Sequence, residues 1–309
     1  MDSEVSHRQR RVAILREHPE VRQLFGPYLQ MALLGTVAVA AQLGFAAMLS
    51  GAPWWLLLAA AYAVGAFLSY ELNIIVHECS HNLVFRGSAL NKAFGILLNV
   101  PGVLPSAIAF RHYHLLHHRF LGQPGVDADV PSRWAIALVG HGKLGKLMWL
   151  LTQPFTYGLI NPMAVRPRIP IDGWLVTNCV AVIAASAAVV YCFGPGALGY
   201  LALCAYFALG PHPTGAHILQ EHIIFEGREE TTSYYGPMNA FSINHGLHVE
   251  HHDFPTVAGP RLARLRAMAS SYYRDRFHHR SRFATLWRFV MDPRIRLDSR
   301  AIRTQSPDL

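Results

Sequence analysis

Two long stretches without a charged residue dominate the pattern of apolar and polar positions along the chain. Residues 23–70 and residues 173–220 contain no Asp, Glu, Lys or Arg, which makes two runs of 48 residues each. A helix needs about 20 apolar residues to cross a bilayer, so each run can hold two spans and a turn. Gly and Pro at residues 50–53 and 194–196 mark the turns. The pattern therefore predicts four transmembrane helices in two hairpins, near residues 29–49, 54–74, 174–193 and 197–217.

The segment between the two runs is apolar but interrupted. Residues 89–109 contain Asn99, Pro101, Gly102 and Pro105, which is too broken for a regular span and favours an interfacial or re-entrant piece. Residues 134–160 mix aromatic and aliphatic side chains with two lysines, which is typical of an amphipathic helix in the headgroup region. The predicted fold class is an all-α integral membrane protein. One domain over residues 1–309 would combine the four spans with interfacial helices and a helical cap.

Composition and charge agree with this interpretation and set its orientation. Hydrophobic residues make up 52% of the chain and charged residues 15%, against about 25% charged in an average soluble protein. A soluble enzyme, a disordered chain and a nucleic-acid binder are therefore not expected. The net charge of +8 belongs to residues 256–309, which hold 12 Arg and 4 Asp. By the positive-inside rule, we expect three cytoplasmic segments, at residues 1–28, 75–173 and 218–309.

The arginines of the C-terminal segment have two interpretations. They can hold residues 260–300 against anionic lipid, at about 1 kcal/mol each near the surface. Alternatively, they can form a docking patch for an acidic electron carrier. Raising the salt concentration would weaken both interactions.

Histidine is abundant, with 18 residues, and three clusters of it carry the candidate chemistry. The clusters read HECSH at 77–81, HLLHH at 114–118 and HVEHH at 248–252. Histidines three or four positions apart share one face of a helix, so those of each cluster can converge on a metal ion. Imidazole suits iron, copper, zinc or nickel. The candidate catalytic and metal-binding residues, enough for two metal ions, are His77, His81, His114, His117, His118, His248, His251 and His252.

Four histidines outside the clusters are candidates for a ninth ligand: His212, His217, His222 and His245. We favour His217 and His222, which fall where the fourth predicted span reaches the cytoplasmic face. Glu221 precedes His222, and a carboxylate beside a ligand commonly orients it. The remaining histidines are expected on the solvated surface, namely His7, His18, His141, His278 and His279.

Several polar residues near the clusters have both a functional and a structural interpretation. Asp127 and Asp129 follow the second cluster and can orient its imidazoles, contact the substrate, or cap a solvated turn. Glu78 can support a ligand or lie in solvent. Tyr234 and Tyr235 can wall the entrance for a lipid headgroup or serve as interfacial anchors.

Three classes of function fit the clusters. HECSH is an H-E-x-x-H sequence, which in zinc proteases supplies two ligands and a Glu base, here His77, His81 and Glu78. A multi-pass metal transporter would place its ligands within broken spans near the bilayer midplane. Iron with open coordination positions activates dioxygen for C–H cleavage, and beside a bilayer the substrate would be a lipid chain. These observations do not separate a desaturase from a hydroxylase.

At the level of motifs the sequence resembles a known family. The three histidine clusters resemble the boxes of the membrane fatty-acyl desaturases and hydroxylases. More specific stretches resemble the sphingolipid delta-4 desaturases, also called dihydroceramide desaturases, from about residue 10 to about residue 298. These stretches are FRHYH (110–114), RFLG (119–122), GVDADVP (125–131), HP (212–213), GAH (215–217), EH (221–222), TSYYGPMN (232–239) and EHHDFP (250–255).

The resemblance implies a specific activity and specific partners. It implies two non-haem irons, held by the eight box histidines, and O2 as co-substrate. The product would be a trans double bond between C4 and C5 of the sphinganine chain of a dihydroceramide-type lipid. A separate donor of the cytochrome b5 or ferredoxin type would supply two electrons. The membrane would be the endoplasmic reticulum in a eukaryote or the inner membrane in a bacterium. A sphingolipid C4-hydroxylase, or another acyl-lipid desaturase on the same scaffold, remains the alternative.

Overall fold

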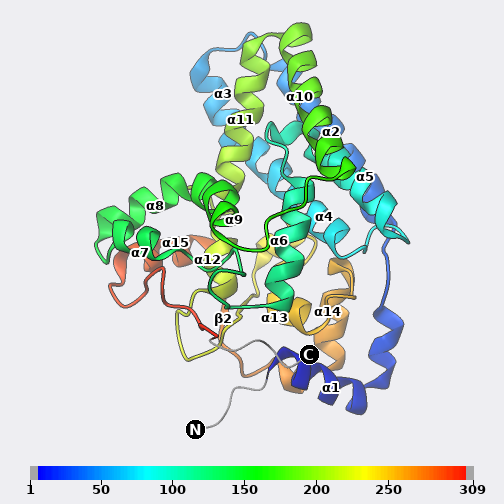
Figure 1. Ribbon diagram of the computed structural model, residues 1–309, viewed down its shortest axis with the longest axis vertical. Coiled ribbons are helices and arrows are strands. Elements are labelled where there is room, and N and C mark those ends of the chain that lie inside the picture. The colour runs from blue at the N-terminus through cyan, green and yellow to red at the C-terminus, as the bar shows by residue number, and fades with distance from the viewer. Residues whose placement is uncertain (1–5, 304–309) are drawn as a thin grey trace.

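The apolar runs form the longest helices of the computed structural model, which describes residues 6–303. Three helices are long and apolar enough to span a membrane: α2 (Gln30–Met48), α10 (Gly173–Phe193) and a continuous helix over Trp54–Ser80. The last comprises α3 (Trp54–Ala60), a π-helical turn η2 (Ala61–Gly65) and α4 (Ala66–Ser80). Apolar α11 (Pro195–Leu209) is shorter, with 15 residues. Figure 1 shows α2, α3, α10 and α11 together at one end of the molecule.

Two of these helices end at positions other than those expected. The second extends past residue 74 to Ser80, so His77 lies on its last turn. The fourth ends at Leu209 rather than near residue 217, and a turn over residues 210–216 follows. Pro211 and Pro213 lie in that turn, and proline removes a backbone donor and disfavours a continued helix. Residues 210–216 therefore form a bend before the next helix.

The interrupted apolar segment is a bent helix pair. Helix α5 (Ser88–Asn99), the short η3 (Val100–Gly102) and α6 (Ala107–Arg119) form two arms at 116°. Asn99 supports the bend, because its side-chain oxygen accepts hydrogen bonds from the backbone N–H groups of Ser106 (2.8 Å) and Ala107 (3.1 Å). The bend directs α6, which carries HLLHH, away from the apolar end.

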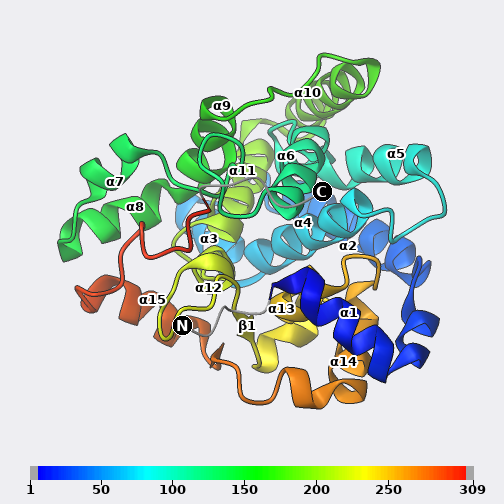
Figure 2. The ribbon, with the colours of Figure 1, turned by 60° about the horizontal axis from the view of Figure 1, so that its bottom comes forward.

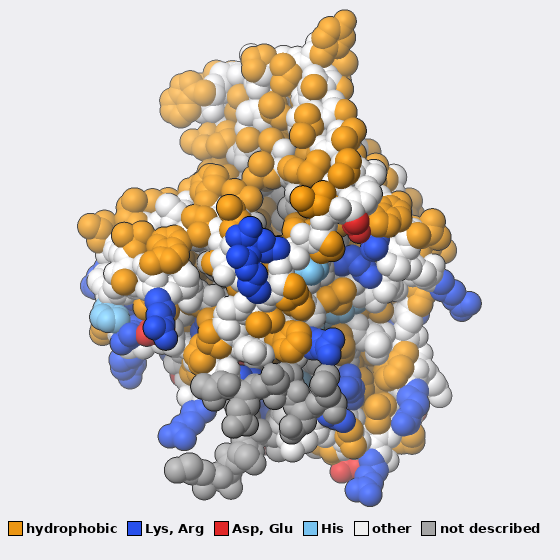
Figure 3. All heavy atoms as spheres, viewed as in Figure 1, with side chains coloured by type: hydrophobic (Ala, Val, Ile, Leu, Met, Phe, Trp, Pro, Cys, Tyr) orange, Lys and Arg blue, Asp and Glu red, His pale blue; other side chains and the backbone are white. Residues whose placement is uncertain are grey.

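The remaining elements form the cap, in which short helices surround the lower ends of α4 and α6 (Figures 1 and 2). Hydrophobic side chains cover the upper part of the visible surface, whereas Lys and Arg lie on the lower part (Figure 3). The predicted class, an all-helical membrane protein, is confirmed; the described strands have two residues each and pair in parallel. The cap elements are α1 (His7–Glu17), η1 (Pro19–Leu24), α7 (Arg133–Val139), α8 (Lys143–Phe155), η4 (Thr156–Ile160), α9 (Asn161–Ala164), α12 (His217–His222), β1 (Ser233–Tyr234), η5 (Pro237–Phe241), α13 (His248–Asp253), α14 (Gly259–Met268), η6 (Ser270–Tyr272), β2 (His278–His279) and α15 (Arg282–Met291).

A buried ion pair fastens the N-terminal helix to the third histidine cluster. Asp253, at the end of α13, is fully buried and accepts hydrogen bonds from Arg10 Nε (2.6 Å) and Nη2 (2.7 Å). Tyr273 also donates to it (3.1 Å), and His7 Nδ1 lies 2.6 Å away. His7 is therefore part of the packed cap, which corrects the expectation that it is solvated; His279 is likewise buried.

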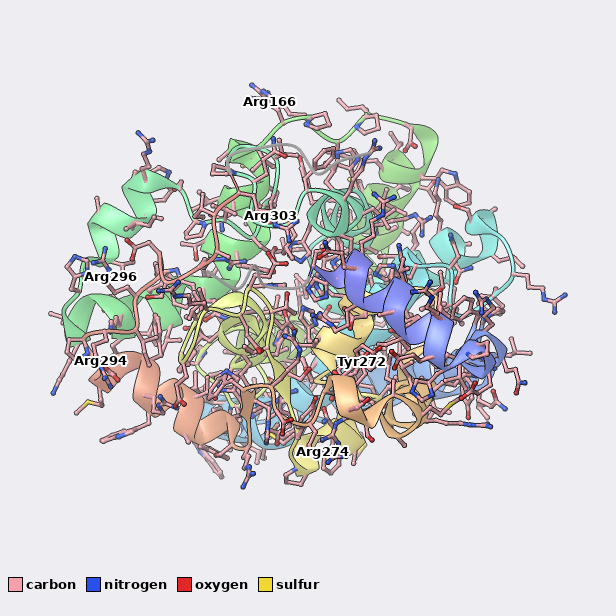
Figure 4. The ribbon with its side chains drawn as sticks, turned by 90° about the horizontal axis from the view of Figure 1, so that it is seen from below. Arg166, Tyr272, Arg274, Arg294, Arg296 and Arg303 are labelled. Atoms are coloured by element: carbon pink, nitrogen blue, oxygen red, sulfur yellow. The ribbon has the colours of Figure 1, made fainter. Side chains whose placement is uncertain are left out.

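The C-terminal arginines do not form a single lipid-facing set. Arg282 is buried and donates to the Thr214 carbonyl (3.3 Å) and the Tyr70 hydroxyl (2.8 Å). Arg261 donates to backbone carbonyls that follow η1. The expectation of a uniformly electrostatic tail is corrected for these two residues. Others, such as Arg274 and Arg294, are exposed and visible on the face opposite the spans (Figure 4).

Candidate metal centre

Five histidines from three helices form one compact group at the junction of the spans and the cap. One nitrogen from each lies within 4.8 Å of the others. The Nε2 atoms of His77 and His251 are 3.1 Å apart, as are those of His118 and His251. Those of His81 and His114 are 2.8 Å apart. We call His77, His81, His114, His118 and His251 the five-histidine group.

Helical spacing explains how this group assembles. His77 and His81 are four positions apart at the end of α4, and His114 and His118 are four apart on α6. Such pairs lie one turn apart on the same face of a helix. Each helix therefore supplies two imidazoles, and α13 completes the group with His251.

A second group lies beside the first. Ring nitrogens of His117, His222 and His252 lie within 4.8 Å of one another. His248 joins them, because its Nε2 lies 3.1 Å from Nε2 of both His222 and His252. The rings of His118 and His252 stack with centroids 4.2 Å apart, so the two groups are in contact. We call His117, His222, His248 and His252 the four-histidine group.

Oxygen acceptors on the outer side of several rings turn Nε2 toward the groups. His117 Nδ1 lies 2.9 Å from Asp127 Oδ1, and His222 Nδ1 lies 3.1 Å from the Glu230 carbonyl. His77 Nδ1 lies 3.3 Å from Glu78 Oε1. An Nδ1–H that donates to oxygen fixes the tautomer and leaves Nε2 free for a metal. This arrangement fits metal-binding imidazoles.

Asp127 is itself held in place. It is fully buried and accepts hydrogen bonds from the backbone N–H groups of Gly122 (2.8 Å) and Asp129 (2.9 Å). Burial alone would raise the pKa of Asp127, but His117, Arg300 and the Gly122 backbone N–H together outweigh burial and hold that pKa below its usual value. A charged Asp127 is the form that supports His117 as a ligand.

The imidazoles of the cap are held in the form that binds metals. The pKa values of His222, His248, His251 and His252 lie well below the usual histidine value, first because of burial and then because other imidazoles surround them. Neutral imidazole is the ligand form. The donor set, nine histidines in two adjoining groups, therefore fits two metal ions.

The candidates for the ninth ligand occupy different positions. His222 belongs to the four-histidine group. His217 lies outside the clusters found among residues 6–303 and has its Nδ1 2.7 Å from the Thr214 carbonyl. His245, which we did not favour from the sequence, forms a third cluster with Glu221 and His248, with its Nε2 3.0 Å from Glu221 Oε1. His245 lies in a turn, outside any helix, so helical spacing in the sequence could not identify it.

Glu78 lies on the wrong side of His77 for a zinc-protease base. Its Oε1 faces Nδ1 of His77, and its Oε2 accepts a hydrogen bond from the Gly259 backbone (2.9 Å). The neighbouring imidazole nitrogens lie on the Nε2 side of His77. Glu78 is also buried, so it links α4 to α14 and does not lie in solvent.

The remaining polar candidates, Asp129 and Tyr235, hydrogen-bond to other side chains near the histidine groups. Asp129 accepts a hydrogen bond from the Tyr157 hydroxyl (2.7 Å), and its other oxygen lies 3.5 Å from His117 Nδ1. Tyr235 donates to Glu250 Oε1 (2.7 Å), and Ser233 donates to the second oxygen of Glu250 (2.8 Å). Glu250 is buried within HVEHH and fixes α13 against β1. No pattern in the sequence singles out Glu250.

Comparison with known proteins agrees with this geometry. A family model for fatty acid desaturases matches residues 52–284, which contain both histidine groups and all the long apolar helices except α2. The protein is therefore a membrane desaturase by class, with histidine clusters typical of a desaturase metal centre. A second model, described as sphingolipid delta4-desaturase, matches residues 1–29.

Individual relatives define the family more closely. The chain is 40% identical to a sphingolipid delta(4)-desaturase DES1-like protein of Oryza sativa subsp. japonica, over 93% of this chain and 86% of the relative. It is 37% identical to the DES1-like protein of Arabidopsis thaliana, over 97% and 90%. It is 34% identical to the sphingolipid delta(4)-desaturase DES1 of Homo sapiens, over 98% and 94%. The chain belongs to the sphingolipid delta4-desaturase family.

Proposed function

We propose that this protein is a di-iron, oxygen-dependent desaturase that introduces a trans C4–C5 double bond into the sphinganine chain of dihydroceramide-type lipids. The observation that carries the proposal is the convergence of nine histidines in two adjoining groups at the end of membrane-length helices. The family supplies the substrate class.

Each proposed iron has its own set of residues. The five-histidine group would hold one iron, and the four-histidine group would hold the other. When bound, such irons supply dioxygen activation and the removal of hydrogen from an unactivated C–H bond. The chain's own contribution is to bring the imidazoles together and to fix three of them through Asp127, Glu78 and the Glu230 carbonyl.

The position of the site suits a bond near the headgroup. C4 of sphinganine is adjacent to the carbon that carries the C3 hydroxyl, so the reacting bond lies at the polar end of the lipid. His77 and His81 lie at the end of the helix over Trp54–Ser80, where a spanning helix meets the interface. A site at this level reaches C4–C5 without drawing the polar headgroup into hydrocarbon.

The proposed reaction has a simple balance. One –CH2–CH2– unit loses two hydrogen atoms and becomes –CH=CH–. One O2 takes up these two hydrogens, two electrons and two protons, and leaves as two water molecules. A separate carrier of the cytochrome b5 or ferredoxin type would deliver the electrons. We place the site on the cytoplasmic side, in the endoplasmic reticulum of a eukaryote or the inner membrane of a bacterium, because Lys and Arg flank the charge-free runs on that side.

Mass spectrometry of sphingoid bases tests this proposal. The chain would be expressed in cells that lack delta-4 desaturation, with the His118→Ala variant as the inactive control. We expect a base lighter by two mass units in cells with the unaltered chain and not in cells with the variant. A base heavier by sixteen would mean C4 hydroxylation instead. Unchanged sphingoid bases with altered fatty acids would mean another acyl-lipid desaturase, and either result would overturn the delta-4 assignment.

A further inference from the structure

Helix α15, near the C-terminus, exposes an apolar face and buries two of its three polar residues. Phe283 and Trp287 are each 67% exposed, and Met291 is exposed as well. These three residues are four positions apart in sequence, so they form one stripe along the helix. On the opposite face Arg282 is 1% exposed and Thr285 is buried. This distribution is the reverse of that on a helix at the surface of a soluble protein.

The buried polar face is hydrogen-bonded to the rest of the protein. Arg282 donates to Thr214 and to Tyr70, as described above. Thr285 accepts a hydrogen bond from Gln220 Nε2 (2.8 Å). The helix is therefore held with its apolar stripe outward, because rotation would leave a buried guanidinium without its partners.

The contacts of Arg282 also fix the level of α15 along the spanning helices. Tyr70 lies in the helix over Trp54–Ser80, seven residues before His77, which corresponds to about 10 Å along a helix. Thr214 follows the end of α11. The beginning of α15 therefore lies beside the spans, on the membrane side of His77.

Helix α8 packs against α15 through Trp149 and Phe289. It also exposes an apolar face and buries polar side chains. Its exposed side chains lie on one face, whereas Lys146 and Gln153 are buried and donate to the backbone carbonyls of Asp292 (2.7 Å) and Gly215 (3.0 Å). The exposed apolar residues are Leu144, Leu147, Met148, Leu151 and Phe155. Two neighbouring helices thus present apolar stripes outward.

The α8 stripe is continuous with the lipid-facing surface. The Tyr206 hydroxyl of α11 donates to the Leu151 carbonyl of α8 (2.9 Å), and the rings of Tyr206 and Phe155 lie 6.3 Å apart. Figure 1 shows α7, α8 and α15 as one lateral group next to the lower end of α11. The bilayer that surrounds α11 therefore extends to α8.

We propose that α15 is a membrane anchor that lies in the plane of the bilayer, with Phe283, Trp287 and Met291 inserted among phospholipid acyl chains beside α8. The tail then contacts the membrane by hydrophobic insertion as well as by charge. Because Gln220 joins α15 to α12, the same lipid contact supports the helix that carries Glu221 and His222. The anchor sets the level at which the histidine groups sit below the interface.

Site-directed fluorescence quenching tests this anchor in reconstituted full-length protein. Cys179 and Cys192, the native thiols that are not buried, would be replaced by Ser, and one Cys would be introduced and labelled with an environment-sensitive dye. The test positions are Trp287→Cys and Met291→Cys, and Leu147→Cys reports on α8. Val12→Cys on α1, which is 61% exposed on the cap, is the matched position in water.

The vesicles would be phosphatidylcholine and phosphatidylglycerol with a doxyl quencher on the acyl chain, and iodide would serve as the aqueous quencher. We expect the labels at 287, 291 and 147 to be quenched severalfold more by doxyl lipid than the label at 12, with the opposite order for iodide. Quenching of 287 and 291 by iodide but not by lipid would overturn the anchor. Protection of both from either quencher would mean that a second copy or another protein covers the stripe, which overturns it equally.

Discussion

The two histidine groups use the same side chain but are built in different ways. The five-histidine group takes four members from two regular helices, where i, i+4 spacing places them. The four-histidine group takes one member from α6, one from α12 and two from α13, and its order depends on oxygen acceptors in loops. Asp127 and the Glu230 carbonyl fix His117 and His222. In the first group only His77 has a comparable contact, with Glu78.

The different construction means that different parts of the protein control each group. The five-histidine group depends mainly on the lengths and packing of α4 and α6. The four-histidine group depends also on the loops around residues 122–129 and 230, and on the contacts that hold α12. We therefore expect changes in polar supporting residues to affect the four-histidine group more than the five-histidine group.

The largest effect is expected from replacing a histidine that contacts two other histidines of its group. His251 Nε2 lies 3.1 Å from Nε2 of both His77 and His118, so His251→Ala should abolish product and remove iron from the five-histidine group. His77→Ala and His117→Ala should abolish product as well. His141→Ala, on the exposed loop between α7 and α8, is the matched control and should keep full activity. Product formed by the His251, His77 and His117 variants alike would contradict the assignment of both groups.

The next largest effect is expected from replacing His222, and the same replacement at His217 should have little effect on bound iron. His222→Ala should lower bound iron from about two per chain to about one and eliminate activity, since it opens the four-histidine group. His217→Ala should retain about two irons per chain, because His217 lies outside both groups. Iron analysis of the two purified variants checks this, and the reverse result would make His217 the ninth ligand.

A smaller effect is expected from the support of His117. Asp127→Asn keeps the shape of the side chain but removes its charge, and loss of such a partner typically costs about 10–100-fold in metal affinity or activity. Iron titration and turnover of the variant would measure this cost, with Glu78→Gln as the matched change in the five-histidine group. An equal or larger loss of iron affinity or turnover in Glu78→Gln would show that the four-histidine group does not depend more on its polar supports than the five-histidine group.

The smallest effect is expected at Tyr157, which contacts Asp129 rather than a histidine of either group. Tyr157→Phe removes the hydrogen bond to Asp129, which is worth about 0.5–1.5 kcal/mol, so turnover should fall by no more than about tenfold. Thermal unfolding should change little. A loss as large as that of Asp127→Asn would show that Tyr157 has a more direct role, such as contact with the substrate.

Local patterns were enough to predict the membrane helices and most of the histidines that converge in the two groups. The charge-free runs located α2, α10, α11 and the helix over Trp54–Ser80, although Pro211 and Pro213 end α11 earlier than hydropathy suggested. The i, i+4 spacing identified His77 with His81 and His114 with His118. These features depend on residues close together in sequence, which is why they could be predicted.

The features that the sequence did not predict depend on contacts between distant segments. Glu250 is buried because Ser233 and Tyr235 come from a separate strand region to meet it. Arg282 looked like one more basic residue of the tail, yet Tyr70, 212 positions earlier, accepts its hydrogen bond. His245 meets Glu221 through a turn without helical repeat. None of these pairings has a local signature.

Metal analysis of the purified, full-length protein is the decisive test for a two-iron site. Two adjoining groups of histidines predict about two irons per chain, with both lost in a variant that lacks His118 and His222. One zinc per chain, or a protein that takes up no iron when it is supplied, would contradict the account.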